Sequence, residues 1–348
     1  MMRKLALVLA IALMPAFGFG VYTYLGSLKT KAVRATAVKP VETKPKFALP
    51  GTMIVIQDGG LYKLSGGTFT ELGKAGSWSQ VAVSPDHTKL VAVSQNSLAS
   101  ELSLLGSDGH VIKQLTHDRV AILDANHWAF YPRISLDGKT VYYSFDQPKR
   151  GYQVDLAVWS MPLNGPQAQA RRMTTPNDHT GGDVTPIPLS GGALLYVKYT
   201  LGATGIASQI WLQSRPLTAG TALTDLASDC NQPSLSPDGK QLAMICTSGK
   251  QSGRLVVAPF DGRRLGPMRT VLAGGLNAAP AWAPDGSGLA YLAPAGAGGH
   301  FQLWWLPFAV PAVSASPSGS ATAPAGRLAP KQVTTDVDLT PTTPLVWY

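Results

Sequence analysis

A short turn phrase recurs along this chain at nearly constant spacing, and that repeat restricts the fold more than any other feature. The clearest copy is LSPDGKQLA, residues 235–243, whose Ser-Pro-Asp-Gly centre is typical of a tight turn between paired strands. The other copies are VSPDHTKLV from Val83, ISLDGKTVY from Ile134, WAPDGSGLA from Trp282 and the weaker PLSGGALLY from Pro188. Successive copies start 51, 54, 47 and 47 residues apart, which is the length of a repeated sheet unit.

The residues after each turn also repeat, and they predict four strands per unit. An apolar segment such as Leu242 to Ile245 comes first, with little polar alternation, so both of its faces should be covered. Another strand, such as QLWWL, follows the apolar segment. A shorter and more polar strand, such as VIKQLT, comes last, as suits an exposed edge. A single unit cannot bury both of its faces, so neighbouring units must stack around an axis. In the first copy His87 replaces the glycine, and we expect it to have a positive φ.

The two ends of the folded region supply parts of one unit. GTMIVIQ from Gly51 resembles a second strand without a first, and PTTPLVWY, Pro341 to Tyr348, resembles a first strand without the others. Pairing of the two would close the ring and remove an open edge. The sequence therefore predicts an all-β, six-bladed propeller of four-stranded antiparallel blades. The blades are Gly51 to Leu72 with the C-terminal strand, Trp78 to Thr116, His127 to Thr175, Gly182 to Leu226, Asp229 to Leu272 and Leu276 to Thr335.

The repeated PxxSPDGxxLA pattern resembles that of the TolB-like six-bladed β-propeller family. The likeness covers about Gly51 to Tyr348 and is carried by the structural turns, so no partner-binding residue can be transferred from it. The resemblance implies a propeller that binds other proteins, often in the bacterial envelope. The family also includes propeller domains attached to peptidases and a few lyases.

The N-terminus predicts a membrane-directed segment before the propeller. Arg3 and Lys4 precede an uncharged run over residues 5–26, which is long enough to span a bilayer as a helix. Pro15 and the small residues after it would equally suit the end of a cleaved signal peptide. We therefore assign residues 1–28 as a signal peptide or transmembrane anchor. The protein is then expected outside the cytoplasm, tethered to the cytoplasmic membrane or secreted after cleavage.

The charge distribution argues against nucleic acid as a partner. The chain has a formal net charge of +9, but residues 1–46 alone contain eight basic residues and one acidic residue. The remainder is nearly neutral, so the basic balance belongs to the leader and to an extended linker over residues 29–50. The propeller should occupy residues 51–348. Within it, residues 309–330 are rich in Ala, Pro and Ser, and we expect them to form a disordered loop.

The only two cysteines, Cys230 and Cys246, flank one of the turns. Pairing across that turn places Asn231 roughly opposite Cys246 and Cys230 one residue beyond, so a disulfide is geometrically possible. An exported protein would permit it. Two buried free thiols remain the alternative.

Standard signatures of catalysis are absent, since the sequence has no G-x-S-x-G, H-E-x-x-H, Walker loop or C-x-x-C. We predict no cofactor and no metal. Polar residues instead gather in the connections between blades, which cross the face of a propeller where ligands usually bind. The candidate ligand- or partner-binding residues are His117, Asp124, His127, Trp128, His179, Asp183, Asn231, Asn277 and Asp336. The same residue types also cap loops, and that structural interpretation stays open.

Two functions fit this sequence. The first is a non-enzymatic, monomeric propeller that binds an envelope protein, a peptide or a cell-surface glycan. The second is a propeller-fold enzyme of the polysaccharide lyase or hydrolase type, in which His117, His127 and His179 gather a metal and a base near the axis.

Overall fold

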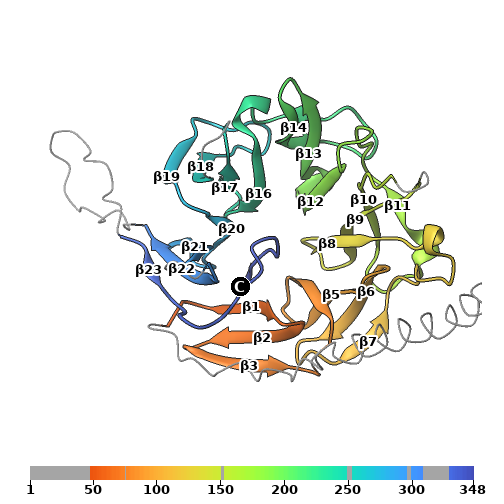
Figure 1. The fold of residues 1–348 in the computed structure, drawn as a ribbon, viewed down its shortest axis with the longest axis horizontal. Coiled ribbons are helices and arrows are strands. Elements are labelled where there is room, and N and C mark those ends of the chain that lie inside the picture. The colour runs from red at the N-terminus through yellow and green to blue at the C-terminus, as the bar shows by residue number, and fades with distance from the viewer. Residues whose placement is uncertain (1–47, 75, 150–152, 249–252, 296–298, 309–328) are drawn as a thin grey trace, which may run out of the picture. The chain divides into compact units, whose positions relative to one another are not determined.

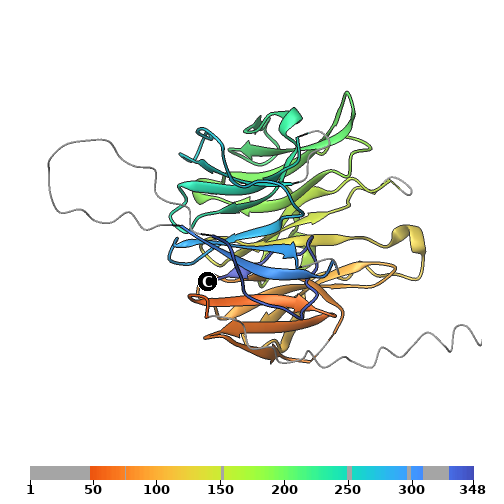
Figure 2. The same cartoon turned by 60° about the vertical axis from the view of Figure 1, so that its left-hand side comes forward.

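Six four-stranded antiparallel sheets, arranged around a common axis, make up the part of the chain that the structure describes (Figure 1). The structure is a computed structural model, and it describes residues 48–74, 76–149, 153–248, 253–295, 299–308 and 329–348. All of these residues fall within the unit Glu42–Tyr348. Turning the view shows the sheets stacked face against face (Figure 2). The predicted all-β, six-bladed propeller is confirmed.

Each sheet has the same order of strands from the axis outward. The strands at the axis are β24 (Val346–Trp347), β4 (Trp78–Val83), β8 (Ala129–Ile134), β12 (Asp183–Pro188), β16 (Cys230–Leu235) and β20 (Ala278–Trp282). The second strands are β1 (Thr52–Gln57), β5 (Lys89–Gln95), β9 (Thr140–Phe145), β13 (Leu194–Gly202), β17 (Gln241–Cys246) and β21 (Gly288–Pro294).

The outer half of each sheet is formed by two further strands. The third strands are β2 (Gly60–Ser65), β6 (Ser100–Gly106), β10 (Ala157–Pro162), β14 (Gly205–Gln213), β18 (Arg254–Pro259) and β22 (Phe301–Pro307). The outermost strands are β3 (Thr68–Leu72), β7 (Val111–Gln114), β11 (Arg171–Arg172), β15 (Thr221–Ala222), β19 (Arg269–Leu272) and β23 (Lys331–Gln332). Four short 3-10 helices lie in connections of the described chain: η1 (Leu123–Ala125), η2 (Gln167–Gln169), η3 (Ser190–Gly192) and η4 (Leu226–Ser228).

Burial follows the strand order that the sequence pattern predicts. The central residues of β5, Leu90 to Val93, are completely buried because neighbouring blades cover both faces of the sheet. All four residues of the outer strand β7 are exposed. Removing the apolar side chains of the second and third strands from water supplies most of the driving force for stacking the blades.

The repeated turns share one hydrogen-bond network. In three of them a serine hydroxyl donates to the aspartate two residues later: Ser84 to Asp86 and Ser135 to Asp137, both at 2.5 Å, and Ser236 to Asp238 at 2.6 Å. These hydrogen bonds hold the pKa of each aspartate below its usual range. His87 has φ 57°, so the predicted left-handed conformation at the glycine position is confirmed.

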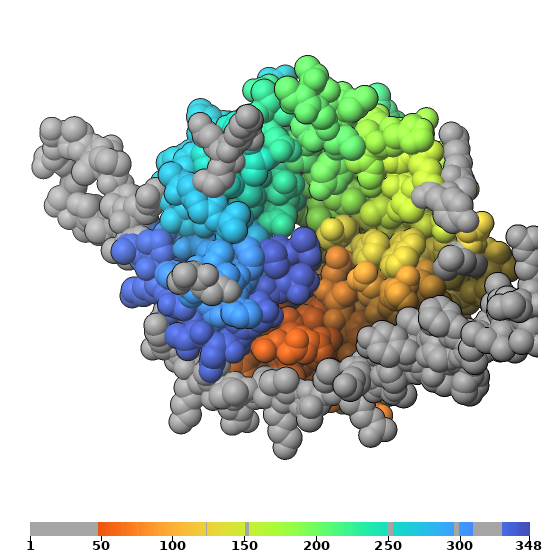
Figure 3. Space-filling model, viewed as in Figure 1, coloured from red at the N-terminus to blue at the C-terminus, as the bar shows by residue number. Residues whose placement is uncertain are grey.

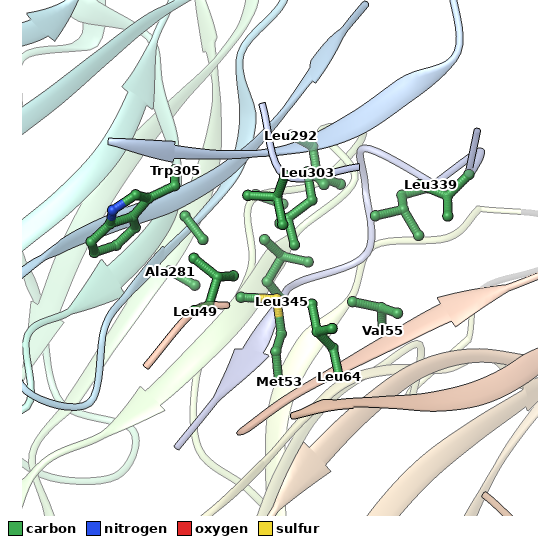
Figure 4. Packing of buried hydrophobic residues seen from close by; sticks show 14 of the residues in the cluster. Leu49, Met53, Val55, Leu64, Ala281, Leu292, Leu303, Trp305, Leu339 and Leu345 are labelled. Carbon is green, nitrogen blue, oxygen red and sulfur yellow. The ribbon is translucent and has the colours of Figure 1, made fainter. Parts of the chain in front are cut away.

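The C-terminal strand closes the ring. In β24, Trp347 lies opposite Met53 and Val346 opposite Ile54, both in β1. The indole Nε1 of Trp347 donates to the carbonyl oxygen of Pro50 at 2.6 Å. A single apolar cluster fills the junction of the first and last blades, where Leu345 packs among residues of β1, β2, β21 and β22 (Figure 4). The predicted closure of the ring is thus present.

Cys230 and Cys246 form a disulfide, with the two sulfur atoms 2.07 Å apart. They lie directly opposite one another, which corrects the expected one-residue offset. The offset disappears because β16 has a bulge between Asn231 and Ser234, and the extra residue shifts the pairing.

Several sequence expectations concern residues that the structure does not describe. The apolar segment over residues 1–28, most of the linker over 29–50 and most of the Ala/Pro/Ser-rich loop over 309–330 lie outside the described ranges. Among the residues that are described, no helix combines the length and apolarity needed to cross a membrane.

Candidate functional site

The propeller has two ends, which we call the turn face and the connection face. The turn face carries the repeated turns between the first and second strands of each blade. The connection face carries the links from one blade to the next, together with the loops between second and third strands. Antiparallel strand order places these two sets of loops at opposite ends of every sheet.

A vestibule of about 530 Å³ opens at the turn face. Residues in or next to the five repeated turns border it, including Pro85, Leu136, Pro188, Pro237 and Pro284, and Tyr348 of the first blade completes the wall. The ring of His87 lies 4.3 Å from that of Tyr348, measured between centroids. The vestibule is therefore built mainly from the scaffold repeats.

A second cavity of about 140 Å³ lies on the axis, between the first strands of four blades. We call it the channel. The C-terminal segment before β24 borders it through Pro341, Thr342 and Pro344, and Figure 3 shows this segment reaching the centre of the ring. The strands β8, β12, β13, β16 and β20 supply the remaining wall.

One bulge geometry recurs around the channel. The residue preceding a proline adopts a positive φ in four successive blades: Tyr131 (53°), Thr185 (49°), Gln232 (49°) and Ala279 (47°). In each strand the register shifts at this point, so one extra residue bends the strand at the axis. All four residues border the channel.

Glutamine side chains link neighbouring blades at these bulges. Gln80 accepts a hydrogen bond from the backbone N–H of Tyr131 through its side-chain oxygen. The side-chain oxygen of Gln232 accepts a hydrogen bond from the backbone N–H of Ala279 at 2.7 Å. Its Nε2 donates to the carbonyl oxygen of Pro341 at 3.0 Å. The bulges therefore contribute to blade contacts as well as to the channel wall.

The connection face holds a separate pocket of about 460 Å³ on the third blade. His127 borders it, and its Nδ1 lies 2.7 Å from Oδ1 of Asp146, a carboxylate that is fully buried at the end of β9. Asp124, Lys149 and Arg172 also border the pocket. Lys149 donates from Nζ to the carbonyl oxygen of Asn126 at 2.8 Å, which fixes the loop that carries His127.

Buried polar contacts hold the connections in place. Four threonines accept the backbone N–H of a third-strand residue through their hydroxyls: Thr116, Thr174, Thr224 and Thr334. Glu101 accepts the backbone N–H groups of Asp118 and Arg119 at 2.8 and 2.9 Å. Such contacts satisfy backbone groups that would otherwise be buried without partners.

The predicted site residues separate into distinct environments. Asp183 is completely buried, and its Oδ1 lies 3.1 Å from Nζ of Lys198, which also donates to the carbonyl oxygen of Thr175 at 2.8 Å. Burial raises the pKa of Asp183, and Lys198 opposes that rise. Asn277 donates to the carbonyl oxygens of Gly253 and Gly274, at 3.1 and 2.7 Å. The contacts of Asp183 and Asn277 are those of structural groups.

The remaining predicted residues do not form one cluster. His117, His179 and Asp336 are exposed, and Trp128 stacks on Phe130 with 5.9 Å between ring centroids. Only Asp124 and His127 border the same pocket, whereas Asn231 borders the channel. In the described part of the chain, no group of three or more His, Cys, Asp or Glu side chains is placed to hold a metal ion.

The polar residues of the channel were not predicted from the sequence. Arg133, next to the last residue of β8, borders both the channel and the vestibule, and Tyr199 of β13 borders the channel. Four blades have a proline three residues before the turn, and the residue before that proline borders the channel, but Arg133 and Tyr199 stand at other positions and had no such signal. No local sequence pattern marks the residues around the third-blade pocket, because folding alone brings together Asp146, Lys149 and Arg172.

Large apolar side chains are exposed mainly at the connection face. Of the twelve such residues among those described, three lie in loops at the turn-face end and two on the outer strand β7. Seven lie at the connection-face end: Leu98, Val120, Ile122, Val154 and Leu276 in loops, and Leu201 and Ile206 at the adjoining ends of β13 and β14. Exposed apolar side chains gathered at one end of a molecule are typical of an interaction surface.

Comparison with known proteins identifies the fold. TolB from Acinetobacter baumannii superposes with a TM-score of 0.60 at 16% sequence identity, over 85% of this chain and 65% of that chain. This chain thus matches less than two thirds of the length of that TolB. The putative TolB from Agrobacterium tumefaciens gives a TM-score of 0.50 at 18% identity, over 67% of this chain and 83% of that one.

These likenesses place the chain among six-bladed propellers with the fold of the TolB structures, which confirms the fold implied by the repeats. No protein-family model matches the chain, and no curated protein matches it in sequence.

Proposed function

We propose that this chain is a non-enzymatic, protein-binding propeller of the bacterial cell envelope, and that its connection face contacts the partner. The observation that carries this proposal is the larger number of exposed apolar side chains at the connection face. The fold shared with the TolB structures supports it. The apolar segment over residues 5–26 supports a location outside the cytoplasm, with a membrane tether or a cleaved signal.

The two faces differ in what they offer a partner. Connection-face loops vary in length and sequence between blades, so they can form a surface specific to one protein. Ile122 and Leu201 are 70% and 72% exposed there, and each would lose its contact with water in an interface. The turn face repeats one short motif, and its exposed side chains are mostly those of the turn itself.

Co-purification from the native host tests the proposal. The full-length chain would be compared with the double variant Ile122→Glu/Leu201→Glu and with the control Leu136→Glu, which changes an equally exposed residue on the turn face. We expect the wild type and the control to retain the same bound protein, and the double variant to lose it. Retention by the double variant, with loss from the control, would reverse the assignment of the binding face.

A second candidate function is catalysis at the third-blade pocket. His127 is oriented by the buried carboxylate of Asp146 at 2.7 Å, the arrangement that prepares an imidazole to act as a base. Lys149 and Arg172 border the same pocket and would attract an acidic sugar. Cleavage of an acidic polysaccharide by the full-length chain, lost in His127→Ala, would favour this function. Elemental analysis of both proteins would show whether a metal takes part.

A further inference from the structure

An unpaired arginine lies at the centre of the ring. Arg133 lies next to the last residue of β8, is only partly exposed, and borders both the channel and the vestibule. It forms no ion pair or hydrogen bond with any described residue. Burial lowers the pKa of its guanidinium, because the surroundings solvate this charge poorly. A half-buried cation without a partner is costly unless another group compensates it.

The surroundings of Arg133 contain no acidic side chain that could compensate the charge. Residues bordering the channel and the vestibule include no Asp or Glu, and His87 is the only other side chain that can carry a positive charge. The side chains that border the two cavities therefore carry a surplus positive charge. An anion supplied from solution would balance it.

Neutral hydrogen-bond donors accompany the guanidinium. The phenol groups of Tyr131 and Tyr199 border the channel and make no hydrogen bond with the residues that the structure describes. Burial raises the pKa of Tyr131 to about 12 and also raises that of Tyr199, so both phenols keep their protons at neutral pH. A protonated phenol can donate to an oxygen anion.

The rest of the channel wall combines the polar residues Thr185, Asn231, Gln232 and Thr342 with apolar ones. Pro233, Pro280, Pro344 and Val197 contribute to it, and the volume of about 140 Å³ is close to that of cavities that accept a benzene-sized molecule, about 150 Å³. We propose that the channel binds a small organic carboxylate, with the carboxylate on Arg133 and the apolar part among these side chains. This site goes beyond the proposed partner surface and does not depend on it.

A carboxylate fits better than a phosphate for reasons of charge and shape. The planar guanidinium matches the two oxygens of a carboxylate, and one positive charge balances one negative charge. A phosphate dianion would bring a second charge into a site whose cavities are bordered by no lysine or second arginine. An uncompensated charge of this kind is disfavoured in poorly hydrated surroundings.

Titration of the purified full-length chain with benzoate tests the inference. We expect saturable binding of one benzoate per chain, with weaker or no binding of benzamide, which has the same shape without the charge. Arg133→Gln should weaken benzoate binding by about 10- to 100-fold, the usual range for losing a charge-assisted hydrogen bond. The control Arg263→Gln, in an exposed turn, should leave binding unchanged.

Three results would overturn the inference: no saturable benzoate binding, equal binding of benzamide and benzoate by the wild type, or unchanged binding in a folded Arg133→Gln. Tighter binding of inorganic phosphate than of benzoate would also overturn the assignment to carboxylates. The benzamide and phosphate comparisons use the wild-type protein, so they decide the question even where Arg133→Gln fails to fold.

Discussion

The turn face and the connection face both contain many carboxylates, but they use them differently. At the turn face Asp86, Asp137 and Asp238 are exposed, and each accepts a hydrogen bond from the serine two residues before it. At the connection face Asp146 and Asp183 are buried, one beside a histidine and the other beside a lysine. The first arrangement is the same in three blades, whereas the second differs from blade to blade.

This difference distinguishes contacts that recur in several blades from contacts that occur in one blade only. A local turn motif needs only neighbours in sequence, so it can be repeated without change. A buried carboxylate needs a partner from another strand, and the free-energy cost of burying it depends on how well that partner compensates the charge. The connection end therefore concentrates the contacts that are specific to this chain, and changes there should have the larger effects on stability.

The largest expected effect follows from removing the partner of Asp183. Lys198→Met would leave a fully buried carboxylate without its cation, which should lower the free energy of unfolding by about 3 to 5 kcal/mol. Chemical denaturation would measure the loss. The exposed turn residue Lys240 provides the matched control, and Lys240→Met should change stability by less than about 0.5 kcal/mol.

The double variant Asp183→Leu/Lys198→Met sharpens that prediction. It removes both charges, so its stability should lie much closer to the wild type than that of Lys198→Met. Additive losses in the double variant would mean that the ion pair is not what stabilises this end of the fourth blade.

The next largest loss of stability is expected from removing the disulfide at the connection end of the fifth blade. Replacing Cys230 and Cys246 together by alanine should lower the free energy of unfolding by about 3 kcal/mol, because the bridge restricts a loop of sequence separation 16 in the unfolded chain. Thermal unfolding with and without a reductant would measure it. A reductant that leaves the melting temperature of the wild type unchanged would contradict the prediction.

A smaller loss is expected at the third-blade pocket. His127→Ala leaves Asp146 with the backbone N–H of Trp128 as its remaining hydrogen-bond donor, and should cost about 2 kcal/mol. The exposed His179 is the control, since His179→Ala removes no such contact and should be nearly neutral. Similar losses in both variants would show that the buried carboxylate does not depend on His127.

The smallest expected effect on stability comes from the titration of Asp86 at the turn face. Hydrogen bonds from Ser84, and then from Thr88, lower the pKa of Asp86 to about 2. Ionised Asp86 therefore stabilises the turn above about pH 4, its usual unfolded pKa, and this contribution is lost as the pH falls through about 2. Ser84→Ala should raise the pKa of Asp86 measured by NMR, with little change in stability at neutral pH. An unchanged pKa would exclude the hydroxyl as its cause.

The same contrast explains what the sequence could predict. The turns, the strand order and the closure by residues 341–348 depend on local patterns that recur, so five imperfect copies were enough to place six blades. The one-residue error at Cys230 arose from a bulge that the strand pattern alone does not show. The pairing of Asp183 with Lys198 was missed because it joins two strands across a sheet. Arg133 was overlooked because nothing in its neighbourhood marks it as charged and unpaired until the ring is closed.

Photo-crosslinking in the native host tests most directly whether the connection face is the binding face. A photoreactive residue would replace Leu201 on the connection face or Leu136 on the turn face, which are 72% and 66% exposed and thus nearly matched. We predict one specific protein adduct from position 201 and none from position 136. An adduct obtained only from position 136, or the same adduct in equal yield from both, would contradict the proposed division between the two faces.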